Sequence, residues 1–183
     1  VTGFDGKELL EDGDVMSIAQ HYSNNGADEL LIFDLSDDDA DHEQSLNLIR
    51  QISRVIDIPM SGGGHIKNLE DVKKLLYAGC QQVFLNYAKA ANIELTEEVS
   101  KRFGKEKIAI CTDSFAQLQA NKARVNEYTS RVILLCDEVD VRTTARLVEV
   151  PVLPVSTRAD RHGLLKLLML DNICGVCGDT FSD

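Results

Sequence analysis

Short apolar runs alternate with segments of helical spacing along this chain. The run Leu-Leu-Ile-Phe at residues 30–33 is typical of a strand buried on both faces of a parallel sheet. Residues 43–55 instead place Leu46, Ile49 and Ile52 on one face of a helix. We predict strands at 29–35, from 58 into the glycines that follow, and at 82–87, 107–112, 131–136, 152–155 and 173–177. Helices are predicted at 14–25, 43–55, 69–78, 96–103, 115–125, 141–147 and 161–170.

Repeated strand–helix units predict a parallel sheet with right-handed crossovers. The spacing between successive strands fits the compact units of a (β/α)8 barrel, although seven strands are expected instead of eight. We therefore predict an α/β fold, a shortened (β/α)8-barrel-like single domain over residues 1–183 whose first strand is missing or replaced. An open doubly wound sheet is the alternative. A gap in the barrel would expose strand edges, so residues 1–4 or a second protomer in a homodimer should cover it.

The chemistry is expected around residues 58–67, which read IPMSGGGHIK. Glycines in such a turn allow positive φ and a close approach to a ligand. The helix expected after Asn68 would direct free N–H groups at an anion in the turn. We expect any bound anion at Gly63 and Gly64, with a donor from His65 when it is protonated and charge from Lys67. An ordinary turn with His65 exposed to solvent is the alternative.

Polar residues gather where the predicted strands end. In a barrel the C-terminal ends of the strands form the active face. The alternative for an aspartate in such a position is that it caps the helix that follows. Six residues at equivalent positions favour a shared polar mouth: Asp34, Ser61, Asn86, Asp113, Asp137 and Ser156.

Charge and composition exclude several classes of function. The net charge of −11 and the absence of a basic stripe argue against a nucleic-acid partner. No apolar run approaches the roughly 18 residues that span a bilayer, so no membrane partner is expected. The acidic residues at 37–39, 41 and 43 are interpreted as a solvated loop, and we expect no metal or other cofactor.

The chain has five cysteines, an odd number without secretory features. This predicts a reducing compartment, the cytoplasm. Cys174 and Cys177 have the spacing of a redox or zinc motif, but a second pair of ligands is missing. We interpret both as buried strand residues.

Four stretches of the sequence resemble the cyclase subunit of imidazole glycerol phosphate synthase. Residues 26–34 (GADELLIFD) resemble its second strand, 58–67 its third strand and first phosphate loop, 83–88 (VFLNYA) its fourth strand, and 103–113 its fifth. The resemblance is good over residues 13–113 and weaker afterwards; a sister isomerase of histidine biosynthesis shares the fold. It implies a phosphoribosyl-type substrate and a catalytic role for Asp113. The substrate- or phosphate-binding positions that it implies are Gly63, Gly64, His65, Asn86, Asp34 and Ser156.

The chain also departs from that family. A second catalytic aspartate, which closes the first strand of the family's barrel, has no counterpart, and the family's lysine after that strand aligns near Thr2. His65 replaces the third glycine of the phosphate loop, and Tyr87 replaces a small hydroxyl residue. The second phosphate turn aligns with residues 156–158, where its glycines are lost. Because one carboxylate leaves half of the proton transfer without an agent, we expect the isolated chain to be inactive as a cyclase.

Two further stretches, 34–37 (DLSD) and 75–80 (LLYAGC), resemble the barrel-like N-terminal region of certain clostridial fused proteins. In those proteins a shortened cyclase-like domain precedes phosphoribosyl-AMP cyclohydrolase and phosphoribosyl-ATP pyrophosphatase domains. The resemblance implies that this chain is a fragment of such a longer hydrolase: a degenerate module with residual phosphate-ligand binding that associates with fused histidine-pathway domains. The alternatives are an active cyclase or related phosphoribosyl isomerase, and a purely structural interaction domain.

Overall fold

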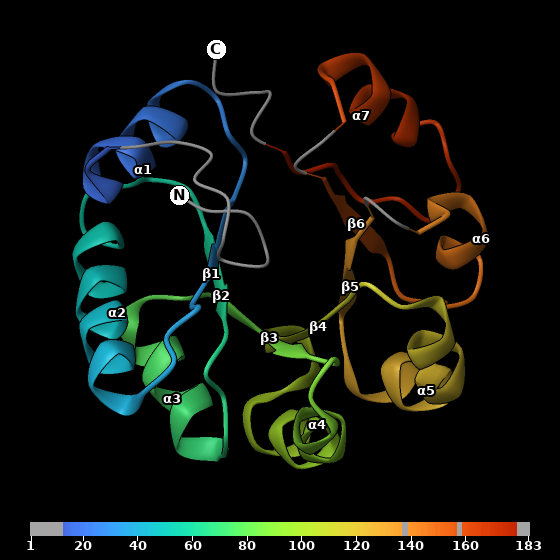
Figure 1. The fold of residues 1–183 in the computed structure, drawn as a ribbon, viewed down its shortest axis with the longest axis horizontal. Helices are drawn as coiled ribbons and strands as arrows, with labels where there is room; N and C mark the ends of the chain where they lie inside the picture. The colour runs from blue at the N-terminus through green and yellow to red at the C-terminus, as the bar shows by residue number, and fades with distance from the viewer. Residues whose placement is uncertain (1–12, 137–138, 157–158, 179–183) are drawn as a thin grey trace. The chain divides into compact units, whose positions relative to one another are not determined.

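The computed structural model describes residues 13–136, 139–156 and 159–178, in which helices and strands alternate (Figure 1). The described strands are β1 (Leu30–Phe33), β2 (Met60–Gly63), β3 (Gln82–Asn86), β4 (Ile108–Thr112), β5 (Arg131–Leu135) and β6 (Val152–Val155). The helices are α1 (Val15–Asn24), α2 (Asp39–Ile52), α3 (Leu69–Ala78), α4 (Ala90–Phe103), α5 (Phe115–Tyr128), α6 (Val141–Ala145) and α7 (Arg161–Leu167), with a short 3₁₀ turn η1 (Lys105–Lys107).

The chain divides into two compact units between Val83 and Phe84, within β3. In the first unit β1 and β2 are parallel, with Leu30 opposite Met60. Helices α2 and α3 pack against each other. Burial of their apolar faces stabilises this unit through the hydrophobic effect. The buried apolar residues of these two helices are Leu46, Ile49, Ile52, Val72, Leu75 and Ala78.

In the second unit β4, β5 and β6 are parallel and follow one another in chain order, with Ile110 opposite Val132 and Val132 opposite Val152. Their side chains are almost continuously apolar and buried, as the two-sided burial of parallel strands requires. The predicted strand at 173–177 is wrong in extent, because only isolated bridges form from Ile173 and Cys177. Cys174 is exposed and Cys177 is only partly buried, which corrects the interpretation of both as buried strand residues.

The predicted fold class is confirmed. In both units neighbouring strands are parallel and sequential, as in a (β/α)8 barrel, and six strands are described where a full barrel has eight. Residues 1–4, which were expected to cover a gap, lie outside the described residues. The assignment of residues 1–183 to one domain stays a prediction.

Side-chain caps decide where several helices begin. Asp38 caps α2 by accepting the N–H of Asp41 at 2.9 Å, so this helix starts at Asp39, four residues before the predicted start at 43. Three of the acidic residues interpreted as a solvated loop therefore form the cap (Asp38) and part of the first turn (Asp39 and Asp41) of a helix, where the helix dipole favours negative charge. Helix α4 starts at Ala90, also earlier than predicted, without a side-chain cap at Lys89.

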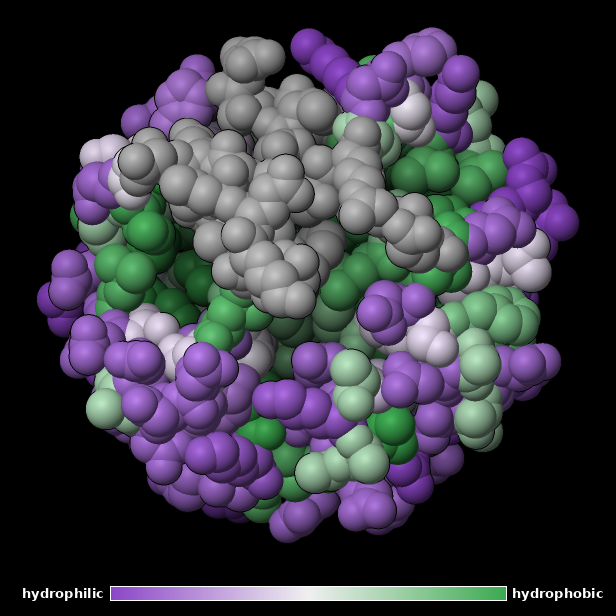
Figure 2. Space-filling model, in the orientation of Figure 1, coloured by the Kyte–Doolittle hydropathy of each residue, from purple (hydrophilic) through white to green (hydrophobic). Residues whose placement is uncertain are grey.

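Hydrophilic side chains line much of the outline of the face shown in Figure 2. Among the described residues, Tyr77 and Met169 are the most exposed of the large hydrophobic side chains. None of the helices in the described ranges combines the length and the apolar character that crossing a membrane requires.

Candidate functional site

The glycine turn after β2 packs against the end of β1 within the first unit. The Asp34 N–H donates to the Gly63 carbonyl at 2.7 Å. Gly64 has φ +108°, and a Cβ at this position would collide with the Asp34 carbonyl oxygen. Gly64 therefore requires glycine, as predicted for this turn. The group that approaches it closely is the chain's own backbone and not a ligand.

His65 lies inside the turn and is 7% exposed, so its interpretation as a solvent-exposed turn residue is wrong. Its Nδ1 lies 3.0 Å from the Ser36 carbonyl oxygen, and its Nε2 lies 2.8 Å from Oδ1 of Asp39. A carbonyl and a carboxylate can only accept, so both ring nitrogens carry hydrogen when both bonds form. The hydrogen bond to Asp39 is the largest cause that raises the pKa of His65 above its ordinary value.

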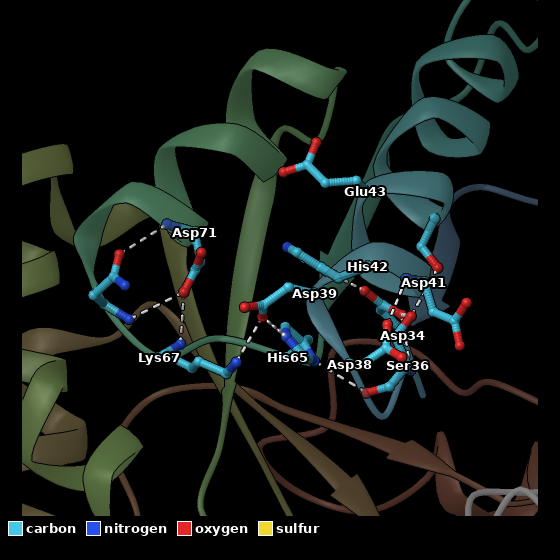
Figure 3. Close-up of polar contacts among 12 residues, drawn as sticks. Asp34, Ser36, Asp38, Asp39, Asp41, His42, Glu43, His65, Lys67 and Asp71 are labelled. Atoms are coloured by element: carbon cyan, nitrogen blue, oxygen red, sulfur yellow. Dashed lines mark hydrogen bonds and ion pairs between the residues drawn. The ribbon is translucent and has the colours of Figure 1, made fainter.

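Asp39 joins both cationic side chains of the turn (Figure 3). The Lys67 Nζ donates to Oδ1 of Asp39 at 2.6 Å, and this is the same oxygen that accepts from His65. Hydrogen bonds from Lys67 and then His65 lower the pKa of Asp39 from 3.8 to about 2. The side chain of Asp39 is nevertheless 83% exposed. A carboxylate of the chain itself thus pairs with both cationic side chains that were predicted to contact an anion.

The start of α3 is also satisfied internally. The Asn68 side chain accepts the N–H groups of Glu70 at 2.8 Å and Asp71 at 3.3 Å. The Asp71 carboxylate accepts those of Lys67 at 2.8 Å and Asn68 at 3.2 Å. The capping box and two further hydrogen bonds thus engage four backbone N–H groups. These are the donors that the sequence suggested for binding an external anion.

A buried pair, Asp34 and His42, packs against the turn. Oδ2 of Asp34 lies 2.5 Å from Nδ1 of His42, and their side chains are 2% and 3% exposed. The Asp34 carboxylate also accepts from the N–H of Ser36 at 3.0 Å and from its hydroxyl. Burial by itself raises the pKa of Asp34, but the hydrogen bonds from Ser36 and His42 outweigh it and the pKa is lowered. The His42 ring stacks on His65 with centroids 4.6 Å apart.

The remaining predicted site residues belong to the second unit. The Asn86 side-chain oxygen accepts from the Ala88 N–H at 2.9 Å, and the buried Ser156 hydroxyl accepts from the Ala159 N–H at 2.9 Å. Asp113 is exposed after β4, beside Ser114, which caps α5. It lines a shallow depression that includes Asp140 of the α6 cap. Within its own unit, each of these side chains stands at the C-terminal end of a strand, as predicted.

Two expected members of the polar mouth are placed differently. Ser61 lies inside β2, not at its end, and its buried hydroxyl donates to Glu29 at 2.5 Å. Asp137 lies outside the described residues. In the described ranges no three His, Cys, Asp or Glu side chains are grouped so that they could hold a metal ion.

Sequence reasoning missed His42, Ser36, Asp39 and Asp71 as members of this site. The signal for His42 was present, because it precedes Leu46 by four positions and Ile49 by seven and so shares their helical face. The wrong start of the helix concealed it. Nothing in the acidic run distinguishes Asp39 from its neighbours before its partner 26 residues away, His65, is known.

The His65–Asp39 pair predicts a pH-dependent contribution to stability. The pKa of His65 is raised in the folded state, so its contribution is complete below 6.5 and is lost as the pH rises through the folded value. The pKa of Asp39 is lowered to about 2, so its contribution is complete above 3.8. We expect His65→Asn, which tolerates the positive φ of 51°, to destabilise the chain more at pH 5 than at pH 8. Urea unfolding of both proteins at the two pH values measures this, and an equal loss at both would contradict it.

The parallel strands, the glycine turn after β2 and the polar residues that follow other strands define an α/β protein of the barrel-like class. Residues 1–171 match the protein family described as "Histidine biosynthesis protein". The chain belongs to this family, as its resemblance predicted.

Similar proteins from several bacteria carry one name, imidazole glycerol phosphate synthase subunit HisF. The protein of Haemophilus influenzae is 33% identical over 132 residues, which cover 72% of this chain and 49% of that protein. The protein of Helicobacter hepaticus is 37% identical over 57% of this chain and 42% of its own length. That of Staphylococcus epidermidis is 34% identical over 63% and 46%. The chain thus spans about half the length of the curated relatives that it matches.

Proposed function

We propose that this chain is a cyclase-like barrel module of a histidine-biosynthesis protein, with residual binding of a phosphate-bearing ligand and without cyclase turnover of its own. The single observation that carries the proposal is the engagement of His65 and Lys67 by Asp39. A phosphate loop whose cations already hold a carboxylate binds a substrate phosphate more weakly, because the ligand must first displace an anion. Weak positioning of the substrate reduces the rate of the step that depends on it.

The position of Asp113 supports the same proposal. The sequence resemblance gives it a catalytic role at the end of the fifth barrel strand, and it stands exposed after β4. General acid–base catalysis requires a group held within hydrogen-bond reach of the reacting proton and sheltered from competing water. Asp34, the carboxylate at the end of β1, is committed to Ser36 and His42 and is buried. It is therefore a poor substitute for a second acid–base group.

An active cyclase is the second candidate, and the names of the relatives support it more directly than they support a module without turnover. All the relatives described above are named as subunits of imidazole glycerol phosphate synthase. In this reading Asp113 carries the acid–base chemistry, and a phosphoribosyl-type substrate displaces Asp39 on binding. The word "subunit" in their name also makes an associated histidine-pathway partner part of this proposal.

Turnover separates the two candidates. The purified chain is incubated with ammonia and the aminated phosphoribulosyl intermediate, with the Haemophilus influenzae relative as the positive control. We expect no product above background from this chain. Ammonia-dependent product that is lost in Asp113→Asn would establish the cyclase candidate and overturn the module.

We further propose that the chain is part of a fused hydrolase. This proposal rests only on the resemblance of residues 34–37 and 75–80. In that reading the chain packs against phosphoribosyl-AMP cyclohydrolase and phosphoribosyl-ATP pyrophosphatase domains of the same protein. Reading the coding sequence downstream of residue 183 tests it directly. The same reading frame is expected to continue into these domains, and an immediate stop codon would contradict the fusion.

A further inference from the structure

The cation pair of the glycine turn consists of His65 and Lys67. His65 has buried contacts on one side and a solvent-exposed partner on the other. On its inner side His65 is fixed by the Ser36 carbonyl and by stacking on His42. His42 is itself held by the buried carboxylate of Asp34. On its outer side His65 meets only one described carboxylate, Asp39, whose side chain is 83% exposed.

We propose that Asp39 is an internal competitor that closes the turn to external anions, and that phosphate monoesters bind His65 and Lys67 only when Asp39 leaves. This inference rests on the proposed binding of a phosphate-bearing ligand and adds the group that regulates it.

The geometry at Oδ1 supports the competition. A single oxygen of Asp39 accepts from His65 Nε2 at 2.8 Å and from Lys67 Nζ at 2.6 Å. Terminal oxygens of a phosphate are strong acceptors that make short charge-assisted hydrogen bonds of the same kind. One oxygen of a phosphate monoester can therefore replace Oδ1 without moving either donor.

Displacement of Asp39 leaves His65 in place and leaves the Lys67 ammonium group available to the ligand. His65 keeps its bond to Ser36 and its stack on His42, both of which are independent of Asp39. Asp39 is the first residue of α2, while the cap of that helix is the neighbouring Asp38, so the helix start does not depend on the Asp39 side chain. An exposed ion pair contributes little to stability, so a dianionic ligand can compete with it.

The start of α3 adds little to this site. The N–H groups of Lys67, Asn68, Glu70 and Asp71 donate to the carboxylate of Asp71 or to the side chain of Asn68. Recognition therefore depends on the two cationic side chains, and removing either should abolish the gain that follows loss of Asp39.

The test is a titration with inorganic phosphate at pH 6, below the ordinary histidine pKa of 6.5, and at constant ionic strength, followed by amide chemical shifts of the full chain. Constant ionic strength is needed because salt screens exposed charges. Asp39→Asn should bind phosphate about fivefold more tightly than the unmodified chain, since the competing conformation is removed and an exposed ion pair opposes binding by no more than this factor. The shifts should centre on Gly64, His65 and Lys67.

Asp41→Asn is the matched control, because Asp41 lies in the same first turn of α2 and carries the same charge. It should change the affinity less than twofold, by screening of a more distant charge. Adding His65→Asn to Asp39→Asn should cancel the gain. Equal affinities of Asp39→Asn and Asp41→Asn, or a gain that survives His65→Asn, would overturn the proposal.

The probe separates this inference from the proposed function. Inorganic phosphate reports on the cation pair alone, whereas the turnover assay reports on catalysis. Cyclase activity in the unmodified chain would reject the module without turnover and leave the competition by Asp39 to be decided by the titration. A titration without a gain in Asp39→Asn would reject the competition whatever the turnover assay gives.

Discussion

Asp34→Ala should lower the free energy of unfolding by about 2–3 kcal/mol, because leaving a buried polar group without its hydrogen-bond partner costs about 1–3 kcal/mol and Asp34 has more than one such partner. The truncation leaves Nδ1 of His42 buried without its acceptor, and it also removes the acceptor of the Ser36 N–H and hydroxyl. Unsatisfied buried donors are costly because no water replaces the lost partner. Urea unfolding at pH 7 measures the effect.

The isosteric variant Asp34→Asn is the control for this prediction. It keeps an oxygen for Ser36 and a polar group against His42, so we expect a loss of about 1–2 kcal/mol, closer to that of one weakened hydrogen bond. Because the pKa of Asp34 is lowered in the folded state, its contribution is present above 3.8 and is lost as the pH falls through the folded value. A loss below 1 kcal/mol for Asp34→Ala at pH 7 would contradict the buried pair.

Gly64→Ala should destabilise the chain by about 2–4 kcal/mol, the sum of backbone strain at positive φ and a steric collision. Gly64 has φ +108°, and a Cβ there would meet the backbone carbonyl of Asp34, which the neighbouring strand holds in place. A backbone atom yields less readily than the end of a flexible side chain. The midpoint and slope of urea unfolding give the change in free energy.

Gly26→Ala separates the two contributions. Gly26 also has positive φ, at +90°, but nothing lies within 4 Å of the position where its Cβ would be. It should therefore cost only about 1 kcal/mol, the strain term alone. If the two substitutions cost the same, the close approach between Gly64 and Asp34 would be wrong.

The sequence predicted the bounds of a helix correctly where a capping residue marks its start and a glycine marks its end. Helix α3 has the predicted bounds because Asn68 caps its start and Gly79, with φ +117°, ends it. The starts of α2 and α4 were predicted too late. In α2 the true cap, Asp38, stands within a run of similar acidic residues, and in α4 the residue before the helix, Lys89, provides no capping side chain.

The candidate site was predictable only in part, for a related reason. The glycines, His65 and Lys67 are adjacent in sequence, so their common position in one turn followed from the pattern. The partner of both cations, Asp39, lies 26 residues before His65 and 28 before Lys67. Such a pairing depends on how α2 and the turn after β2 meet in the folded unit, which hydrophobic periodicity does not specify.

An NMR titration of the Asp39 side-chain carboxyl carbon tests directly whether Asp39 engages the cations of the glycine turn. We expect a pKa of about 2, held down by Lys67 and His65. The same carboxyl should titrate at a higher pH in His65→Asn, because one of its two hydrogen-bond donors is then gone. An Asp39 pKa near the ordinary 3.8, unchanged by His65→Asn, would show that the carboxylate does not engage His65 and Lys67 in solution.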